Sequence, residues 1–194
     1  MKQTIRSFIA VEMGLAVREA AARMVAQLQP ARADVKWVET QNLHLTLAFL
    51  GDVLLRETHE ICKVLTEAVQ DLPPFDLEIR GAGAFPTLQR PRTIWLGAAA
   101  GREPMIALQE RIETALHKKL GYRRESRRFQ PHLTIGRVRS GGPAIAELAR
   151  ILTEHADYEF GLTAVDEVVL FSSELTPKGP IYEALGHAEL REKP

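Results

Sequence analysis

Two short segments of this chain repeat one pattern, and the repeat constrains the fold more than any other feature. His44-Leu45-Thr46-Leu47 and His132-Leu133-Thr134-Ile135 both read histidine, apolar residue, threonine, apolar residue. In an extended strand, successive side chains point to opposite faces of the sheet, so each histidine shares a face with its threonine. The two segments therefore predict two strands that each present an imidazole and a hydroxyl together.

The spacing of the two segments indicates an internal duplication. The second histidine follows the first by 88 residues in a chain of 194, which is too long for a solenoid repeat and is typical of a duplicated half-domain. We therefore predict an α+β protein with two pseudo-symmetric lobes, each an antiparallel sheet with outer helices, around a central cleft. Residues 1–194 are expected to form a single bilobed domain, with the lobes contributed roughly by the two halves of the chain and strands exchanged between them.

Hydrophobic periodicity places helices and strands alternately along the chain. Alternating or continuous apolar runs predict strands, and apolar residues at helical spacing predict helices, one of them beginning near Pro104 and ending at Gly121. Besides the second motif strand, the expected strands are residues 5–11, 35–38, 43–50, 75–79, 93–96, 165–171 and 181–185, and the expected helices are residues 14–29, 54–70, 104–121 and 145–152.

Composition limits the class of partner. The 25 basic residues balance the 25 acidic residues, so any contact with RNA is expected to be local and short. Cys62 is the only cysteine, which excludes an intrachain disulfide and a cysteine-based zinc site and leaves a packed thiol as the simplest interpretation. Without a signal peptide or an apolar span, the chain is expected to be cytoplasmic, monomeric and without a membrane partner.

The paired histidines and threonines suit acid-base attack on a phosphate diester. Two imidazoles with ordinary pKa values of about 6.5 can hold opposite protonation states at neutral pH, so one can activate water while the other protonates the leaving oxygen. The two threonine hydroxyls can donate to the non-bridging oxygens. A two-histidine metal site is the competing interpretation, but catalytic zinc needs a third protein ligand, and no Asp or Glu lies within two residues of His44 or His132. We therefore predict no metal and no cofactor.

The chain resembles the LigT-like branch of the two-histidine (2H) phosphoesterases, which are RNA 2′,3′-cyclic phosphodiesterases also called 2′-5′ RNA ligases. The resemblance extends from about residue 6 to about residue 185. It rests on the following segments in this order: Arg6-Ser7-Phe8-Ile9-Ala10, Asn42-Leu43-His44-Leu45-Thr46-Leu47-Ala48-Phe49-Leu50-Gly51, Gly83-Ala84-Phe85-Pro86, Ile94-Trp95-Leu96-Gly97, Pro131-His132-Leu133-Thr134 and Ser172-Ser173-Glu174-Leu175.

The resemblance implies a reaction and assigns roles to the motif residues. His44 would be the general acid that protonates the departing 3′ oxygen, and His132 the general base, so that a 2′,3′-cyclic phosphate becomes a 2′-phosphomonoester; the sequence leaves the swapped assignment open. The substrate would be an RNA end, such as a tRNA half in tRNA processing, or a small cyclic nucleotide. Two other functions stay open: 2′-5′ RNA ligation, which reverses the chemistry, and a non-catalytic module that binds nucleotides or RNA ends.

Four further residues are candidates for substrate binding. By resemblance, Phe49 would flank the nucleobase and Arg137 would approach the phosphate. Each follows its motif histidine by five residues, so strict alternation would place it on the opposite face unless a bulge or the strand's end intervenes. Phe8 is either part of an aromatic wall or a core residue. Arg128 ends the basic run at residues 118–128, which is either a solvated loop or an RNA contact, and its nearness to the second motif makes it a candidate phosphate ligand.

Overall fold

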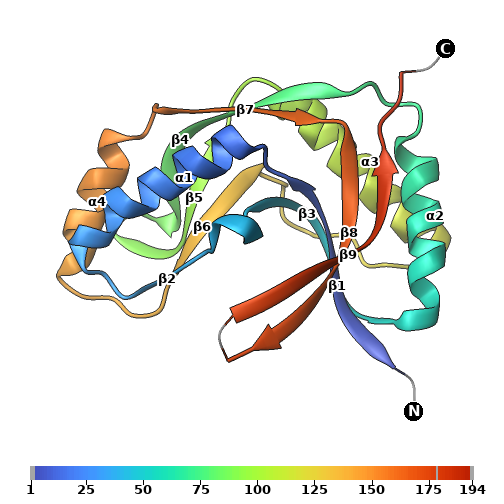
Figure 1. Cartoon of the computed structure of the whole chain (residues 1–194), viewed down its shortest axis with the longest axis horizontal. Coiled ribbons are helices and arrows are strands. Elements are labelled where there is room, and N and C mark those ends of the chain that lie inside the picture. Colours follow the sequence, from blue (N-terminus) through green and yellow to red (C-terminus); the bar gives the residue numbers. More distant parts are fainter. Residues whose placement is uncertain (1–2, 178, 193–194) are drawn as a thin grey trace.

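Two antiparallel sheets form the framework of the molecule. The computed structural model describes residues 3–177 and 179–192, and Figure 1 shows the two sheets with α-helices on their outer sides. This arrangement confirms the predicted α+β class. The first sheet, sheet A, has the strand order β3-β1-β8-β9, and the second, sheet B, has the order β2-β6-β5-β4-β7. The strands of sheet A are β1 (Thr4–Glu12), β3 (His44–Leu54), β8 (Glu167–Thr176) and β9 (Gly179–Glu189), and those of sheet B are β2 (Val35–Trp37), β4 (Phe75–Thr87), β5 (Arg90–Ala98), β6 (His132–Val138) and β7 (Glu159–Val165).

The helices bury apolar stripes against the outer sides of the sheets. Helix α1 contacts β7 and α4, and α4 contacts β4, so both cover sheet B, whereas α2 packs on β9 and on α3. The stripe expected on the first helix is confirmed, because Val17, Ala20, Ala21, Met24 and Leu28 are all buried. None of the helices in the described residues is long and apolar enough to cross a membrane. The helix bounds are α1 (Leu15–Leu28), α2 (Thr58–Val69), α3 (Arg102–Leu120) and α4 (Ala144–Glu154).

Strand exchange between the two sheets is extensive. The order β3-β1-β8-β9 combines two strands from the start of the chain with two from its end, and β2, which lies between β1 and β3 in sequence, pairs with β6 in sheet B. Ser7–Ala10 of β1 pair with Val169–Ser172 of β8, so β1 lies in the interior of sheet A. Sheet A therefore cannot form from either half of the chain alone.

Strand β7 corrects the sequence-based prediction. The expected strand over residues 165–171 is wrong at its start, because Val165 is the last residue of β7 and β8 begins at Glu167. Sequence periodicity missed β7 because its exposed Leu162 breaks the alternation, while its buried Thr163 accepts a hydrogen bond from the backbone N–H of Gly14 over 3.2 Å. Strand β4 is also longer than predicted and extends through Gly81 and Gly83 to Thr87.

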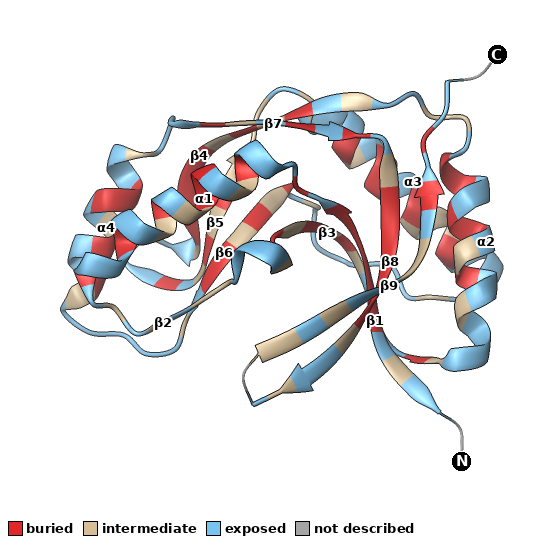
Figure 2. Ribbon diagram, in the orientation of Figure 1, coloured by how far each residue is buried: buried red, intermediate tan, exposed pale blue. Residues whose placement is uncertain are grey.

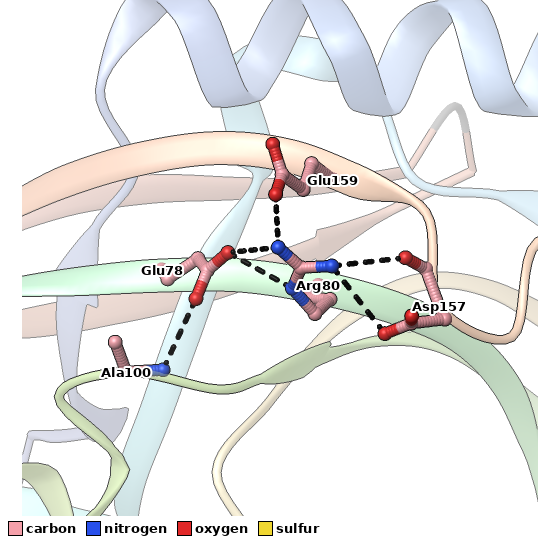
Figure 3. Close-up of polar contacts among 5 residues, drawn as sticks. All are labelled: Glu78, Arg80, Ala100, Asp157 and Glu159. Atoms are coloured by element: carbon pink, nitrogen blue, oxygen red, sulfur yellow. Dashed lines mark hydrogen bonds and ion pairs between the residues drawn. The ribbon is translucent and has the colours of Figure 1, made fainter.

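A cluster of charged side chains fastens β4 to β7 at the far edge of sheet B. Arg80 of β4 forms ion pairs with Glu78 at 2.9 Å, with Asp157 at 3.4 Å and with Glu159 of β7 (Figure 3). A carboxylate oxygen of Glu78 also accepts a hydrogen bond from the N–H of Ala100 at 3.4 Å. Because these ion pairs join β4 to β7, the last strand of sheet B, the cluster stabilises the edge of the sheet.

Sheet A has apolar side chains on both faces. One face joins the main core, which includes Ile9 and Val11 of β1. The other face carries a separate small cluster of Phe8, Ala10, Val169 and Phe171, against which Tyr182 packs. Figure 2 shows the buried residues of sheet A on its central strands, with mostly half-buried and exposed residues toward the end of the β8–β9 hairpin. Because this second cluster lies on the face that carries the first motif, sheet A offers an apolar surface beside His44.

Candidate active site

The first motif lies on β3, and a bulge in this strand decides which side chains accompany it. In the pairing of β1 with β3, Ile9 is opposite Ala48 and Ala10 is opposite Thr46, so Leu47 is an extra, unpaired residue. Beyond this bulge, Phe49 is opposite Phe8. Phe8 and Ala10 are alternate residues of β1 and share a face, and residues directly opposite each other share a face as well. Phe49 therefore lies on the same face as Thr46 and His44.

The second motif, on β6, contains a bulge at the equivalent position. Gly136 is opposite Ile94 and Thr134 is opposite Trp95, which leaves Ile135 unpaired. His132, Thr134 and Arg137 are opposite Gly97, Trp95 and Thr93, which are alternate residues of β5. Arg137 therefore shares the face of His132 and Thr134. In both motifs, the third residue after the histidine is the bulge. The bulge is the irregularity that Phe49 and Arg137 need in order to lie on the same face as the histidines.

Each bulged residue has its carbonyl satisfied by a donor outside the ordinary strand ladder. The carbonyl of Ile135 accepts a hydrogen bond from the backbone N–H of Val38 at 2.9 Å. The carbonyl of Leu47 accepts one from the side-chain amide of Gln109 on α3 at 3.4 Å. Gln109 is one of the few buried polar side chains and is only 4% exposed. Gln109 thus supplies the hydrogen-bond donor for the bulge carbonyl in β3, and the backbone N–H of Val38, just after β2, supplies it for the bulge carbonyl in β6.

Replacing Gln109 is expected to destabilise the protein. The substitution Gln109→Leu removes the donor and leaves the buried Leu47 carbonyl without a partner, which costs about 1–3 kcal/mol. Urea unfolding followed by circular dichroism measures this difference in the free energy of unfolding. The matched control is Gln27→Leu on the exposed side of α1, which is expected to change stability by less than about 0.5 kcal/mol. Equal stabilities of the two variants would show that the amide does not support the bulge.

Both motif histidines are held by the same kind of hydrogen bond. Nδ1 of His44 lies 2.8 Å from the carbonyl oxygen of Asn42, and Nδ1 of His132 lies 2.6 Å from the carbonyl oxygen of Gln130. A carbonyl only accepts, so Nδ1 carries the proton in each ring and Nε2 is the nitrogen left for chemistry. Nε2 can accept a proton from water when the ring is neutral and can donate one when the ring is charged. The two rings are therefore equally equipped to act as base or acid.

Arg137 acts on both histidines. Burial lowers the pKa of His44 most strongly, against the opposing effect of the Asn42 carbonyl, and the positive charge of Arg137 lowers this pKa further. Burial is also the main cause of the lowered pKa of His132, which the Gln130 carbonyl raises and Arg137 again lowers. Coulomb interactions weaken with distance, and the strands β3 and β6 lie next to each other. Arg137 is thus within electrostatic range of both His44 and His132, and these histidines with Thr46 and Thr134 are hereafter called the two-histidine site.

Aromatic rings surround the two-histidine site on both sheets. The ring of Phe8 lies 4.8 Å from that of His44 and 6.3 Å from that of Phe49, measured between centroids. Phe8 is 4% exposed, so it is a buried residue that also contacts the histidine, whereas Phe49 is 72% exposed. This exposed ring has little packing role within the chain and is available to a ligand.

Two aromatic residues of the site were not predicted from the sequence. Tyr182 of β9 lies edge-on to His44 at 5.3 Å, and Phe85 of β4 lies edge-on to His132 at 5.1 Å. Phe85 belongs to one of the segments that carry the family resemblance, and this was the only sequence signal for it. Tyr182 lies in a strand that was predicted, but nothing in its neighbourhood in the sequence links it to His44.

Arg128 and the basic run lie beside helix α3. Arg128 is exposed and lines a hollow together with Arg124, Arg127, Phe129 and residues of α3. Arg124 lies 3.8 Å from Glu113 of α3. Arg128 therefore shares this hollow with acidic residues of α3, and its role as a phosphate ligand stays a prediction.

The other histidines lie outside the site. His59, His117 and His187 are exposed to solvent. His155 is half-buried at the end of α4, where its Nδ1 lies 2.9 Å from the carbonyl of Ile151 and its ring packs near Tyr158. Among residues 3–177 and 179–192, no three histidine, cysteine or acidic side chains are grouped so that they can hold a metal ion.

Comparison with known proteins gives consistent matches over nearly the whole chain. The family model described as the 2′-5′ RNA ligase superfamily matches residues 16–176. An RNA 2′,3′-cyclic phosphodiesterase from Methanothermobacter thermautotrophicus is 40% identical over 179 residues, which cover 92% of this chain and 95% of that protein. A second protein of that name, from Aquifex aeolicus, is 33% identical over 180 residues, which cover 93% of this chain and 94% of the other.

Solved structures match the fold to the same extent. The crystal structure of TT0787 from Thermus thermophilus superimposes with a TM-score of 0.82 at 29% identity, covering 97% of this chain and 100% of that one. The crystal structure of E. coli LigT complexed with 3′-AMP superimposes with a TM-score of 0.77 at 25% identity, covering 98% and 100% of the two chains. The arrangement of two sheets is therefore shared with both proteins.

Proposed function

The chain belongs to the 2′-5′ RNA ligase superfamily and is an RNA 2′,3′-cyclic phosphodiesterase, and we propose that the two-histidine site carries out its reaction. The proposal rests on the observation that the imidazole rings of His44 and His132 have similar surroundings. Both donate Nδ1–H to a carbonyl, both keep Nε2 for the reaction, and both respond to the charge of Arg137. A cyclic phosphate between them would meet one proton donor and one proton acceptor.

The reaction needs one proton at each end of the phosphorus centre. His132 takes a proton from water through Nε2, and the water oxygen forms a bond to phosphorus. His44 gives its Nε2 proton to the 3′ oxygen as the bond between that oxygen and phosphorus breaks. The products are a 2′-phosphomonoester and a free 3′ hydroxyl. The family resemblance supports this assignment of acid and base, and the similar surroundings of the two rings also allow the reverse.

The remaining groups of the site stabilise charge and bind the substrate. Thr46 and Thr134 share faces with the histidines, so their hydroxyls would donate to the non-bridging oxygens as negative charge builds on them. Arg137 would pair with the phosphate, since a guanidinium matches two oxygens at once. Phe49 would flank the nucleobase with its exposed ring. In this proposal the protein groups suffice for both proton transfers without a metal ion.

One incubation tests turnover, metal independence and the position of bond cleavage. The protein is incubated with a nucleoside 2′,3′-cyclic phosphate in the presence of EDTA, and the monophosphate product is identified by chromatography against 2′ and 3′ standards. We expect the 2′-phosphate. A 3′-phosphate would refute the direction of cleavage, loss of turnover in EDTA would refute a metal-free reaction, and binding without any product would indicate the non-catalytic module.

The pH dependence of the reaction should reveal both histidines and the influence of Arg137. The base must be neutral and the acid protonated, so kcat/KM is expected to follow a bell-shaped profile. Because burial and Arg137 lower both pKa values, the bell should lie to the acid side of that expected for two unperturbed imidazoles. In Arg137→Gln, loss of the positive charge makes both rings easier to protonate, so both limbs move to higher pH. A displacement to lower pH, or none, would contradict the shared position of Arg137.

The physiological setting is part of this proposal. An RNA end, such as a tRNA fragment, or a small cyclic nucleotide would both meet the groups described. The bound 3′-AMP in the LigT structure supports a site for one nucleotide in this chain too. A cytoplasmic location and a monomeric state stay predictions, which cell fractionation and sedimentation velocity would check.

A further inference from the structure

One face of sheet A holds polar groups that the proposed reaction does not use. This face, which carries His44 and Thr46 and is called here the site face of sheet A, is ordered in rows that cross the strands. Phe49, Phe8 and Phe171 form one row, because Phe8 is paired with Phe49 on one side and with Phe171 on the other. Alternate residues of a strand are roughly 7 Å apart, so the next row along the strands lies at about that spacing.

The row beyond the aromatic one is polar. On β1 it contains Arg6, two residues before Phe8, with Asp52 opposite on β3. On β8 it contains Ser173, two residues after Phe171, with Tyr182 opposite on β9. Arg6 and Ser173 come one residue beyond the last β1–β8 pair, Ser7 with Ser172, and are therefore neighbours. Ser173 belongs to a segment that carries the family resemblance but has no part in the chemistry proposed so far.

The polar row extends to the two-histidine site through Tyr182. Its ring lies edge-on to His44 at 5.3 Å and edge-on to Phe8 at 5.0 Å. Burial raises the pKa of Tyr182, and the charges of Arg137 and then Arg6 oppose this effect. The phenol therefore lies within electrostatic reach of two guanidinium groups, one from each sheet. A ligand that reaches from His44 along the site face would pass from Arg137 toward Arg6.

The charge of Arg6 is available to a ligand. Arginines elsewhere, such as Arg80, Arg111 and Arg150, form ion pairs with carboxylates. Within residues 3–177 and 179–192, Arg6 forms no ion pair, although Asp52 is its cross-strand neighbour. Arg6 is also exposed, while Ser173 and Tyr182 beside it are half-buried. A cation next to two hydroxyl groups suits a phosphate group.

We propose that Arg6, Ser173 and Tyr182 form a subsite for the 5′-phosphoryl group of the nucleotide whose 2′,3′-cyclic phosphate lies in the two-histidine site. The inference rests on the proposed function and adds a preference to it. In a nucleotide, the 5′ carbon leaves the ribose on the side away from the 2′,3′ edge. A substrate with its cyclic phosphate at the histidines and its base on Phe49 therefore directs its 5′ group across the aromatic row to the polar row.

The test compares two substrates that differ at one group. The kcat/KM values are measured for adenosine 2′,3′-cyclic phosphate with a free 5′ hydroxyl and for the same compound with a 5′-phosphate. In the wild-type protein we expect the 5′-phosphorylated substrate to be preferred about tenfold, as for one charge-assisted hydrogen bond. In Arg6→Gln this ratio should fall to about one. The matched control, Arg23→Gln on α1, removes the same charge and should keep the wild-type ratio.

The outcomes separate the subsite from the reaction. If the wild-type protein hydrolyses both compounds equally well, or if Arg6→Gln keeps the wild-type ratio, the subsite is refuted while the proposed function stands. If neither compound is hydrolysed, the proposed function fails instead. An equal fall of the ratio in Arg23→Gln would show a long-range charge effect and would also refute the subsite. If Arg6→Gln does not fold, Ser173→Ala decides, because it should lower the ratio and an unchanged ratio overturns the proposal.

Discussion

His44→Ala and His132→Ala are each expected to lower kcat by about 10²- to 10⁴-fold, the range typical of a lost general acid or base. Each substitution removes one of the two Nε2 atoms that the hydrogen bonds to Asn42 and Gln130 leave for the reaction. Because the two rings act in one step, the double variant should be hardly slower than the slower single variant. Steady-state rates with a cyclic mononucleotide measure the loss.

The control for these variants is His59→Ala. His59 is an exposed histidine on α2, so its removal should leave kcat within about twofold of the wild-type value, as for a surface change away from the site. Circular dichroism and the urea midpoint should show that all three variants are folded, since both motif histidines are partly exposed. A variant of either motif histidine with full activity would remove that residue from the mechanism. Multiplicative losses in the double variant would mean that the two rings contribute independently and do not act as a unit.

Thr46→Val and Thr134→Val are expected to lower kcat by about 10²- to 10³-fold each, as for the loss of one oxyanion donor. Valine keeps the branched shape that suits a strand and removes only the hydroxyl. Since the charge on the non-bridging oxygens grows in the transition state, kcat should fall more than KM rises.

Serine provides the matched control at both threonine positions. Thr46→Ser and Thr134→Ser retain the hydroxyl and should keep most of the activity. If valine and serine were equally active, the hydroxyls would have no role in stabilising charge. If KM rose while kcat stayed constant, they would bind the ground state and the transition state equally.

The sequence predicts well those elements whose pattern comes from a single buried stripe. The five residues expected to face inward on α1 are all buried, because a helix on the outer side of a sheet has one apolar contact surface. The two motif strands are equally readable, since Leu45 and Leu133 point into the core while the histidines and threonines alternate with them.

Alternation of apolar and polar residues gives wrong predictions where the pairing of two strands contains a bulge. Alternation alone places Phe49 and Arg137 on the wrong face, because the bulges at Leu47 and Ile135 look like ordinary apolar strand residues in sequence. Their partners, Gln109 and Val38, are distant in the chain. Tyr182 and Phe85 reach the site only through the pairing of distant strands. These contacts depend on tertiary structure, and periodicity carries no information about them.

The position of β1 inside sheet A affects how the protein folds during its synthesis on the ribosome. Strand β1 pairs with β3, which is synthesised soon after it. The other edge of β1 cannot pair until residues 169–172 of β8 have been synthesised. During most of synthesis this edge offers unpaired backbone groups, and open edges invite pairing with other nascent chains. Truncated mRNAs that end before the codon for Glu167 would therefore yield fragments that lack both Tyr182 and β8, the strand that pairs with the open edge of β1. Such fragments should aggregate and should not retain partial activity.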